Sequence, residues 1–202
     1  MTAAQGAETP ATPQPSGLLD VLSQVPRSTR WILPTLKGAL SGTDVSTLEL
    51  RTRSLVLLRV AAVDRAPYWR LQLETGARAL GITEDELRLI GSDEWEISPA
   101  FNERERAAIL WADRVARRLA RRDKPAFESV RAHFSDEELV ELTLVSSLGA
   151  MVDRLTNALR IPPEPPIGLS PGAAPTPDES LEAWAPRMFD SDVCGNWTRT
   201  SG

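Results

Sequence analysis

The sequence predicts an all-α protein: one helical-bundle domain of residues 17–162, between a short N-terminal tail and a long C-terminal arm. Three observations favour this fold class. Apolar residues recur at helical spacing over long segments. Capping residues, prolines and glycines stand at the boundaries of those segments. No segment alternates strictly enough between apolar and polar residues to predict a strand. Because the connections are short, we expect helices adjacent in sequence to run antiparallel.

The first 16 residues are rich in Ala, Pro, Thr and Gln, so we expect a disordered tail. Ser16 is placed to cap a short helix over 18–24, which Pro26 ends. A second short helical segment is expected over 30–40. The domain therefore opens with small elements rather than with a core helix.

Residues 47–63 are predicted to form the central helix, because they are apolar over most of the helical circumference. The chain then breaks sharply. Pro67 suits the first turn of the next helix, where its missing N–H would be unpaired in any case. That helix is expected to end near Leu80, with Gly81 just beyond its last turn.

Capping residues mark the starts of three further helices. The predicted ranges, with their capping residues, are 83–90 (Thr83 and Glu86), 103–122 (Asn102) and 136–159 (Ser135 and Glu138). Another helix is expected over 125–133, and a loop over 91–101. The apolar stripe of the 103–122 helix is expected to include Leu119, and that of the last helix Leu144 and Leu159.

The opposite face of the 103–122 helix carries seven arginines: Arg104, Arg106, Arg114, Arg117, Arg118, Arg121 and Arg122. Acidic residues are interleaved with them, and the whole chain has a formal charge of −5. These two facts favour a solvated or intersubunit face, and we expect no nucleic-acid partner.

The character of the chain changes after Ile161. Residues 163–202 are rich in proline, which removes backbone donors and breaks helices, so this segment is predicted to be an extended arm. Its aromatic and apolar side chains need a surface to cover them. We therefore expect a homo-oligomer, a dimer, trimer or hexamer, in which the arm contacts a neighbour.

The cysteine and hydropathy patterns bound the cellular setting. Cys194 is the only cysteine, which excludes an intrachain disulfide and a Cys-rich metal site and is consistent with a reducing cytoplasm. The N-terminus lacks the features of a secretory signal, and no apolar run is long enough to cross a bilayer. We expect a cytoplasmic protein with no membrane partner, no metal and no cofactor.

Three segments together resemble a known family. They are RTRSLVLLRVAAVDRAPYW with GARALGITEDEL, then FNERERAAILWAD, then HFSDEELVELTLVSSLGAMVDRLTNAL. Their order is similar to that of the carboxymuconolactone decarboxylase and alkylhydroperoxidase D (AhpD-like) superfamily, over roughly residues 30–162. The resemblance implies an all-helical domain that forms a homo-oligomer, which is a dimer, trimer or hexamer.

The resemblance also implies a redox motif, Cys-x-x-Cys-x-x-x-His, with a Glu on the preceding helix. In such a motif a cysteine at a helix N-terminus has a lowered pKa, and its thiolate attacks peroxide. On this sequence the two Cys positions fall on Ala66 and Trp69, the His position on Leu73 and the Glu position on Ser54. All four residues are replaced, so we expect no thiol peroxidase chemistry at this place.

The replaced corner nevertheless carries polar and aromatic residues. Tyr68 and Arg70 are candidate catalytic residues, and His133, the only histidine, is a candidate general base. Candidate substrate-binding residues are Ser54, Arg59, Trp69 and Gln72. A purely structural role for these side chains is the competing interpretation, and a structural ion pair is expected for Asp153 and Arg154.

Three functions are compatible with these patterns. The first is a cofactor-independent lyase, isomerase or dehydratase that binds a small organic acid or secondary metabolite in the family pocket. The second is a non-catalytic oligomeric binding or scaffold protein. The third is a peroxidase that uses Cys194 brought by the arm of a neighbouring subunit. This thiol has no second thiol in its own subunit to resolve the oxidised cysteine.

Overall fold

The computed structural model describes residues 18–23, 25, 32, 35 and 46–163. Within them the chain is all-helical, as predicted. The helices are α1 (Leu18–Ser23), α3 (Leu50–Asp64), α4 (Pro67–Ala79), α5 (Glu84–Ile90), the 3-10 helix η1 (Glu94–Glu96), α6 (Glu103–Ala116), α7 (Lys124–His133) and α8 (Asp136–Ala158). The 1–16 tail, most of 30–40 and the arm beyond 163 lie outside the described residues.

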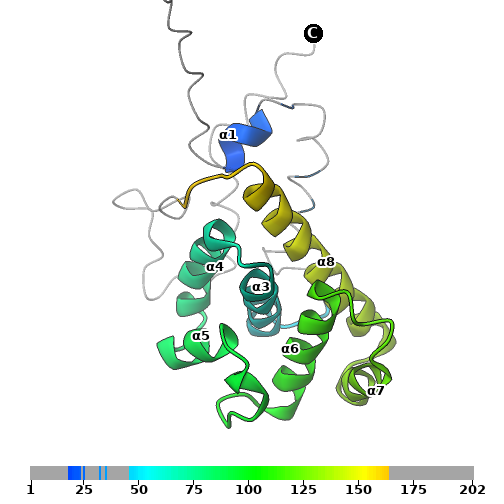
Figure 1. Cartoon of the computed structure of the whole chain (residues 1–202). Helices are drawn as coiled ribbons and strands as arrows, with labels where there is room; N and C mark the ends of the chain where they lie inside the picture. The colour runs from blue at the N-terminus through cyan, green and yellow to red at the C-terminus, as the bar shows by residue number, and fades with distance from the viewer. Residues whose placement is uncertain (1–17, 24, 26–31, 33–34, 36–45, 164–202) are drawn as a thin grey trace, which may run out of the picture.

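Helix α3 is the centre of the bundle. Figure 1 shows it nearly end-on, with α4 and α5 on one side and α6 and α8 on the other. Its residues Leu55, Val56, Val60 and Ala61 have no exposed surface. The predicted central helix is therefore confirmed, and the apolar pattern over most of its circumference follows from having neighbours on several sides.

The three longest helices run in the same direction. Arg51 near the start of α3 bonds Glu105 near the start of α6, and Arg59 bonds Asp113 further along both helices. Helices α6 and α8 are related in the same way. Arg104 near the start of α6 bonds Glu138 in the first turn of α8, and Arg154 near the end of α8 bonds the Ala116 carbonyl at the end of α6. The C-terminal ends of α3, α6 and α8 therefore lie at one end of the bundle. The intervening helices carry the chain back, so neighbours in sequence are antiparallel as expected.

The predicted capping boxes are confirmed. The Thr83 hydroxyl accepts from the Glu86 backbone N–H, and the Glu86 carboxylate accepts from the Thr83 backbone N–H. Ser135 and Glu138 make the same reciprocal pair at α8. Asn102 also caps α6, with Glu105 as its reciprocal partner. Each box satisfies two N–H groups that the helix leaves unpaired.

Two helical predictions were wrong. Helix α6 ends at Ala116, not at Arg122, because Arg118 has a left-handed backbone (φ 62°) and the N–H groups of Leu119 and Ala120 bond back to the Arg114 carbonyl. Leu119 is consequently exposed. On α8, Leu144 and Leu159 are 63% and 50% exposed, and do not belong to its buried face.

Among the described helices, none has both the length and the apolar content that a bilayer crossing requires.

Candidate functional site

The α3–α4 corner, residues 64–72, is built by a single backbone reversal. Helix α3 ends at Asp64, and Arg65 takes a left-handed conformation (φ 52°) that points the chain back. The Arg65 and Ala66 N–H groups bond to α3 carbonyls, and Pro67 then opens α4. A non-glycine residue in this conformation is uncommon, and here the hydrogen bonds on both sides of it hold the turn.

The corner brings together three of the predicted site residues. Tyr68, Trp69 and Gln72 all lie on α4 and are 1%, 3% and 2% exposed. The Tyr68 hydroxyl accepts a hydrogen bond from the Leu18 backbone N–H of α1 at 3.1 Å. The Trp69 indole N–H is buried and has no hydrogen-bond partner. Tyr68 and Trp69 pack against residues of α3 and α1 and so join these helices to α4.

The positions of the family's redox motif are filled by apolar volume. Ala66 and Trp69 belong to a buried cluster with Ala61, Val152, Leu18, Leu22, Ile32 and Ile161. Leu73 is partly buried and packs against the same cluster. The corner that the resemblance identified as a reactive site is therefore, in the described residues, a closed part of the core.

Other predicted residues do not join this corner. The Arg70 guanidinium bonds Glu74 at 2.7 Å and the Leu87 carbonyl at 3.4 Å, so it connects α4 to α5. Ser54 is half-buried on α3, more than two turns before the corner. A substrate contact by either residue stays without structural support.

The Arg59 side chain forms hydrogen bonds with several residues within the fold. Its guanidinium donates to the Asp113 carboxylate, to the carbonyls of Ile90 and Ser92, and to Asp93. It also lies over the Trp95 ring, 5.3 Å from the ring centre. The side chain is 3% exposed, so a substrate contact by Arg59 also stays without support.

The expected ion pair between Asp153 and Arg154 was wrong. Arg154 instead approaches Asp64 at 3.5 Å, and both carboxylate oxygens of the fully buried Asp153 lack a hydrogen-bond partner. Burial, and then the nearby Asp64 charge, raise the pKa of Asp153 to about 8, against a smaller opposing effect of Arg154. At neutral pH this carboxyl is therefore largely protonated.

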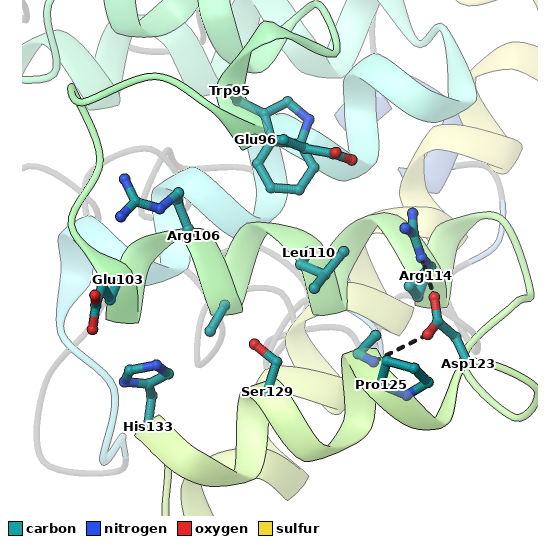
Figure 2. A pocket seen from close by; sticks show the side chains of 12 residues that line it. Trp95, Glu96, Glu103, Arg106, Leu110, Arg114, Asp123, Pro125, Ser129 and His133 are labelled. Atoms are coloured by element: carbon teal, nitrogen blue, oxygen red, sulfur yellow. Dashed lines mark hydrogen bonds and ion pairs between the residues drawn. The ribbon is translucent and has the colours of Figure 1, made fainter.

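An open groove lies on another side of the bundle, between α6, α7 and η1. We call it the α6–α7 groove; its volume is about 740 Å³. Its polar lining residues are Glu96, Glu103, Arg106, Arg114, Asp123, Ser129 and His133. In Figure 2 Glu103, Arg106 and His133 line one end, Ser129 lies on the α7 side, and the Arg114–Asp123 ion pair closes the other end.

The two ends of the groove differ in how their charges are used. The Arg114 guanidinium bonds Asp123 and Asp113, each at 2.6 Å, so its charge is neutralised within the fold. The pKa of Asp123 is lowered by the Ala126 backbone N–H and by Arg114. By contrast, the side chains of Glu103, Ser129 and His133 bond no other described residue, and within the described residues Arg106 uses only Nη1, on the carbonyls of Ser98 and Phe101. The free end is thus available to a ligand.

Of the residues at this end of the groove, the sequence analysis named His133 as a candidate but not Glu103, Arg106 or Ser129. A signal was present, because Ser129 and His133 are four residues apart and thus share one face of α7. The pairing of that face with Glu103 and Arg106 on α6 is a tertiary fact. Within the described residues, no three His, Cys, Asp or Glu side chains gather in a way that could hold a metal ion.

Residues 26–114 match the sequence model of the carboxymuconolactone decarboxylase family. The fold matches that of a protein of unknown function from Agrobacterium tumefaciens, whose proposed role is AhpD-type antioxidant defence. The TM-score is 0.65 at 26% identity, over 71% of this chain and 95% of the other. The segment of residues 26–114 is similar to the carboxymuconolactone decarboxylase family, and the fold is that of the AhpD-like superfamily.

Two further structures share the superfamily fold. One is a peroxidase-related protein from Silicibacter, with a TM-score of 0.64 and 17% identity over 72% of this chain and 75% of the other. The second is the debrominase Bmp8, a Cys-to-Ala variant in complex with 2,3,4-tribromopyrrole. It has a TM-score of 0.59 and 16% identity over 87% of this chain and 81% of the other. Among functionally curated proteins, none matches the chain significantly.

Proposed function

We propose that this member of the superfamily acts on a small organic acid in the α6–α7 groove by acid–base chemistry, with no thiol step. The reaction class is that of a lyase or isomerase. The observation that carries the proposal is the free end of the groove, where an imidazole, a carboxylate and a hydroxyl that bond no other described residue line one open cavity. Such groups can orient a substrate and transfer its protons.

The charges of the lining define the ligand class. The unused N–H groups of Arg106 suit a carboxylate, which a guanidinium binds through paired hydrogen bonds. Glu103 and Glu96 have no recorded partner and suit an amino or hydroxyl group. We therefore infer an organic acid that also carries an amino or hydroxyl substituent. His133 is the proton carrier, because one nitrogen of a neutral imidazole accepts a proton and the other donates one.

Peroxidase activity of the kind named for structural neighbours is not part of the proposal. The positions for the two thiols hold Ala66 and Trp69, and the single cysteine is Cys194. A thiolate is the nucleophile in such chemistry, and a second thiol is needed to resolve the oxidised form. Cys194→Ser should therefore leave any activity of the protein unchanged.

The test uses hydroxy-, keto- and amino-dicarboxylic acids in D₂O. Proton NMR would follow exchange of carbon-bound hydrogen, and a thermal shift would report binding. We expect His133→Gln to abolish exchange while retaining binding, and Arg106→Gln to weaken binding. Tyr68→Phe is the matched control for the corner and should alter neither. Loss of exchange in Tyr68→Phe with a normal His133→Gln would return the site to the corner.

A non-catalytic oligomeric scaffold is the second candidate. It is favoured by the exposed apolar side chains on α8: Val140 and Leu144 are 61% and 63% exposed and one turn apart. Such a stripe is a typical contact surface for another chain. If no acid in the panel binds or exchanges while the protein forms a stable oligomer, this second function is the correct one.

A further inference from the structure

The turn between α6 and α7, residues 117–124, is fixed by its own backbone. The Leu119 N–H bonds the Arg114 carbonyl at 2.7 Å, and the Asp123 N–H bonds the Leu119 carbonyl at 3.1 Å. The Asp123 carboxylate then caps α7 through the Ala126 N–H at 3.0 Å. The side chains of this turn are therefore held on an ordered frame.

This turn collects cations without partners. The side chains of Arg118, Arg121, Arg122 and Lys124 are exposed, and none of them makes an ion pair or hydrogen bond with another described residue. Elsewhere in the described residues, only Arg65 and Arg160 share this property. Four uncompensated positive charges within seven residues repel one another, and a negatively charged partner would relieve that repulsion.

An apolar hollow of about 460 Å³ adjoins these cations and is lined by Trp111, Ala120, Arg121, Lys124 and Phe127. The rings of Trp111 and Phe127 lie 5.8 Å apart at a tilt of 54°. The Trp111 N–H is already bonded to the Thr143 hydroxyl at 2.9 Å. The hollow therefore offers an aromatic surface edged by positive charge, which suits an aromatic side chain flanked by carboxylates.

The chain itself contains such a segment. Residues 178–192, DESLEAWAPRMFDSD, hold five carboxylates and one arginine, a net charge of −4. Trp184 lies in the middle of it. The four unpartnered cations of the turn match this charge in number and oppose it in sign, in a chain whose overall charge is −5.

The arm begins at the end of the bundle where the 117–124 turn lies. Arg154, one turn before the end of α8, bonds the Ala116 carbonyl at the end of α6 at 3.4 Å. The chain therefore leaves α8 close to where the 117–124 turn starts. The intervening residues, 164–177, can span up to about 45 Å when extended, since each residue adds about 3.3 Å. The connecting segment is therefore long enough for residues 178–192 to reach the turn of their own chain.

We propose that residues 178–192 dock on the 117–124 turn of their own chain, with Trp184 in the hollow lined by Trp111 and Phe127. The carboxylates of the segment neutralise the arginines and the lysine of the turn. The docked segment covers a face of the bundle next to the α6–α7 groove, because α7 contributes to both.

The only cysteine provides the probe. A nitroxide on Cys194 of the full-length protein places a paramagnetic label two residues after the segment, and broadening of backbone amide signals reports its proximity. We expect the amides of residues 117–127 to broaden at about 0.1 M salt and to sharpen at about 1 M, where the Debye length is about 3 Å. Arg121→Glu with Arg122→Glu should abolish the broadening.

Arg65→Glu with Arg160→Glu is the matched control for charge. It reverses the two unpartnered arginines that lie outside the turn but at the same end of the bundle, and it should leave the broadening intact. Trp184→Ala should reduce it. Amides of the turn that stay sharp in the labelled wild type, or broadening that survives the Arg121 and Arg122 reversals, would overturn the proposal. Equal broadening in a mixture of labelled and isotope-enriched copies would assign the segment to a neighbouring chain and overturn docking within one chain.

Discussion

Asp113 is the buried anion on which several arginines converge. Its side chain is 2% exposed and accepts from Arg59 Nε and Nη2 at 2.9 and 2.6 Å. Arg114 and Arg117 bond the same carboxylate, at 2.6 and 3.0 Å. Asp113→Asn keeps the shape but removes the charge, and so leaves the buried Arg59 cation with little compensation. Breaking a buried pair in this way costs about 3–5 kcal/mol.

The chain provides a matched control on the same arginine. Asp93 also accepts from Arg59 Nη2, at 2.9 Å, but its side chain is 83% exposed. An exposed ion pair contributes about 0.2–1 kcal/mol, so Asp93→Asn should have a small effect. Urea unfolding at pH 7, followed by tryptophan fluorescence, measures both. For a slope near 2 kcal/mol/M, the Asp113→Asn midpoint should fall by about 2 M.

Acid titration gives an independent check of the same reasoning. Burial tends to raise the pKa of Asp113, but hydrogen bonds and charges of Arg117 and Arg59 outweigh it, so the pKa lies below its usual value. A lowered pKa contributes stability that is present above the unfolded pKa of about 3.9 and is lost as the pH falls through the folded pKa. The difference between wild type and Asp113→Asn should thus be constant from pH 5 to 8 and shrink below about pH 4. Equal effects of the Asp113 and Asp93 variants, or a difference that persists in acid, would refute the interpretation.

Three further outcomes are expected. Asp153→Asn should be more stable than wild type, by an amount that grows from about pH 4 and levels off above the folded pKa of about 8. The cause is the raised pKa of Asp153, which costs wild type up to about 5 kcal/mol over that range. A difference in denaturation midpoint between the two proteins that is the same at pH 5 and at pH 8 would count against this. Leu144→Arg should lower the molar mass seen by light scattering without lowering the melting temperature, since Leu144 is exposed in the single chain; an unchanged mass would remove α8 as a contact surface. Tyr68→Phe should destabilise by about 1 kcal/mol through loss of the bond from the Leu18 N–H, and no change in the unfolding midpoint would show that this bond contributes nothing.

The features that sequence predicted well depend on neighbours in the chain. The capping boxes at Thr83 and Ser135 need only residues three positions apart, and Pro67 acts on its own turn. The central position of α3 follows from its apolar circumference. These signals survive without any knowledge of tertiary structure.

The features that sequence missed depend on other elements. Helix α6 ends because Arg118 has a left-handed backbone, and the sequence has no glycine there that would have predicted this end. The exposure of Leu144 depends on which helices pack against α8. The partner of Arg154 was misjudged because its sequence neighbour, Asp153, faces the core. The free end of the groove likewise arises only when α7 folds back on α6.

The corner and the groove differ in the free energy that ligand binding would cost. Opening the corner would expose Leu18, Leu22 and Ile32, each less than 7% exposed, and would break the bond from Leu18 to Tyr68. At about 1.5–3 kcal/mol for each buried aliphatic side chain, exposure costs about 5–9 kcal/mol. That is comparable with the whole stability of a typical domain, about 5–15 kcal/mol. A small ligand would have to supply this free energy before it gained any affinity at the corner. The groove is already open and its polar groups at one end are unpaired, so the same ligand binds there without that cost. In this chain, therefore, the residues at the positions of the superfamily's redox motif are part of the core, and the proposed site in the α6–α7 groove needs no such opening.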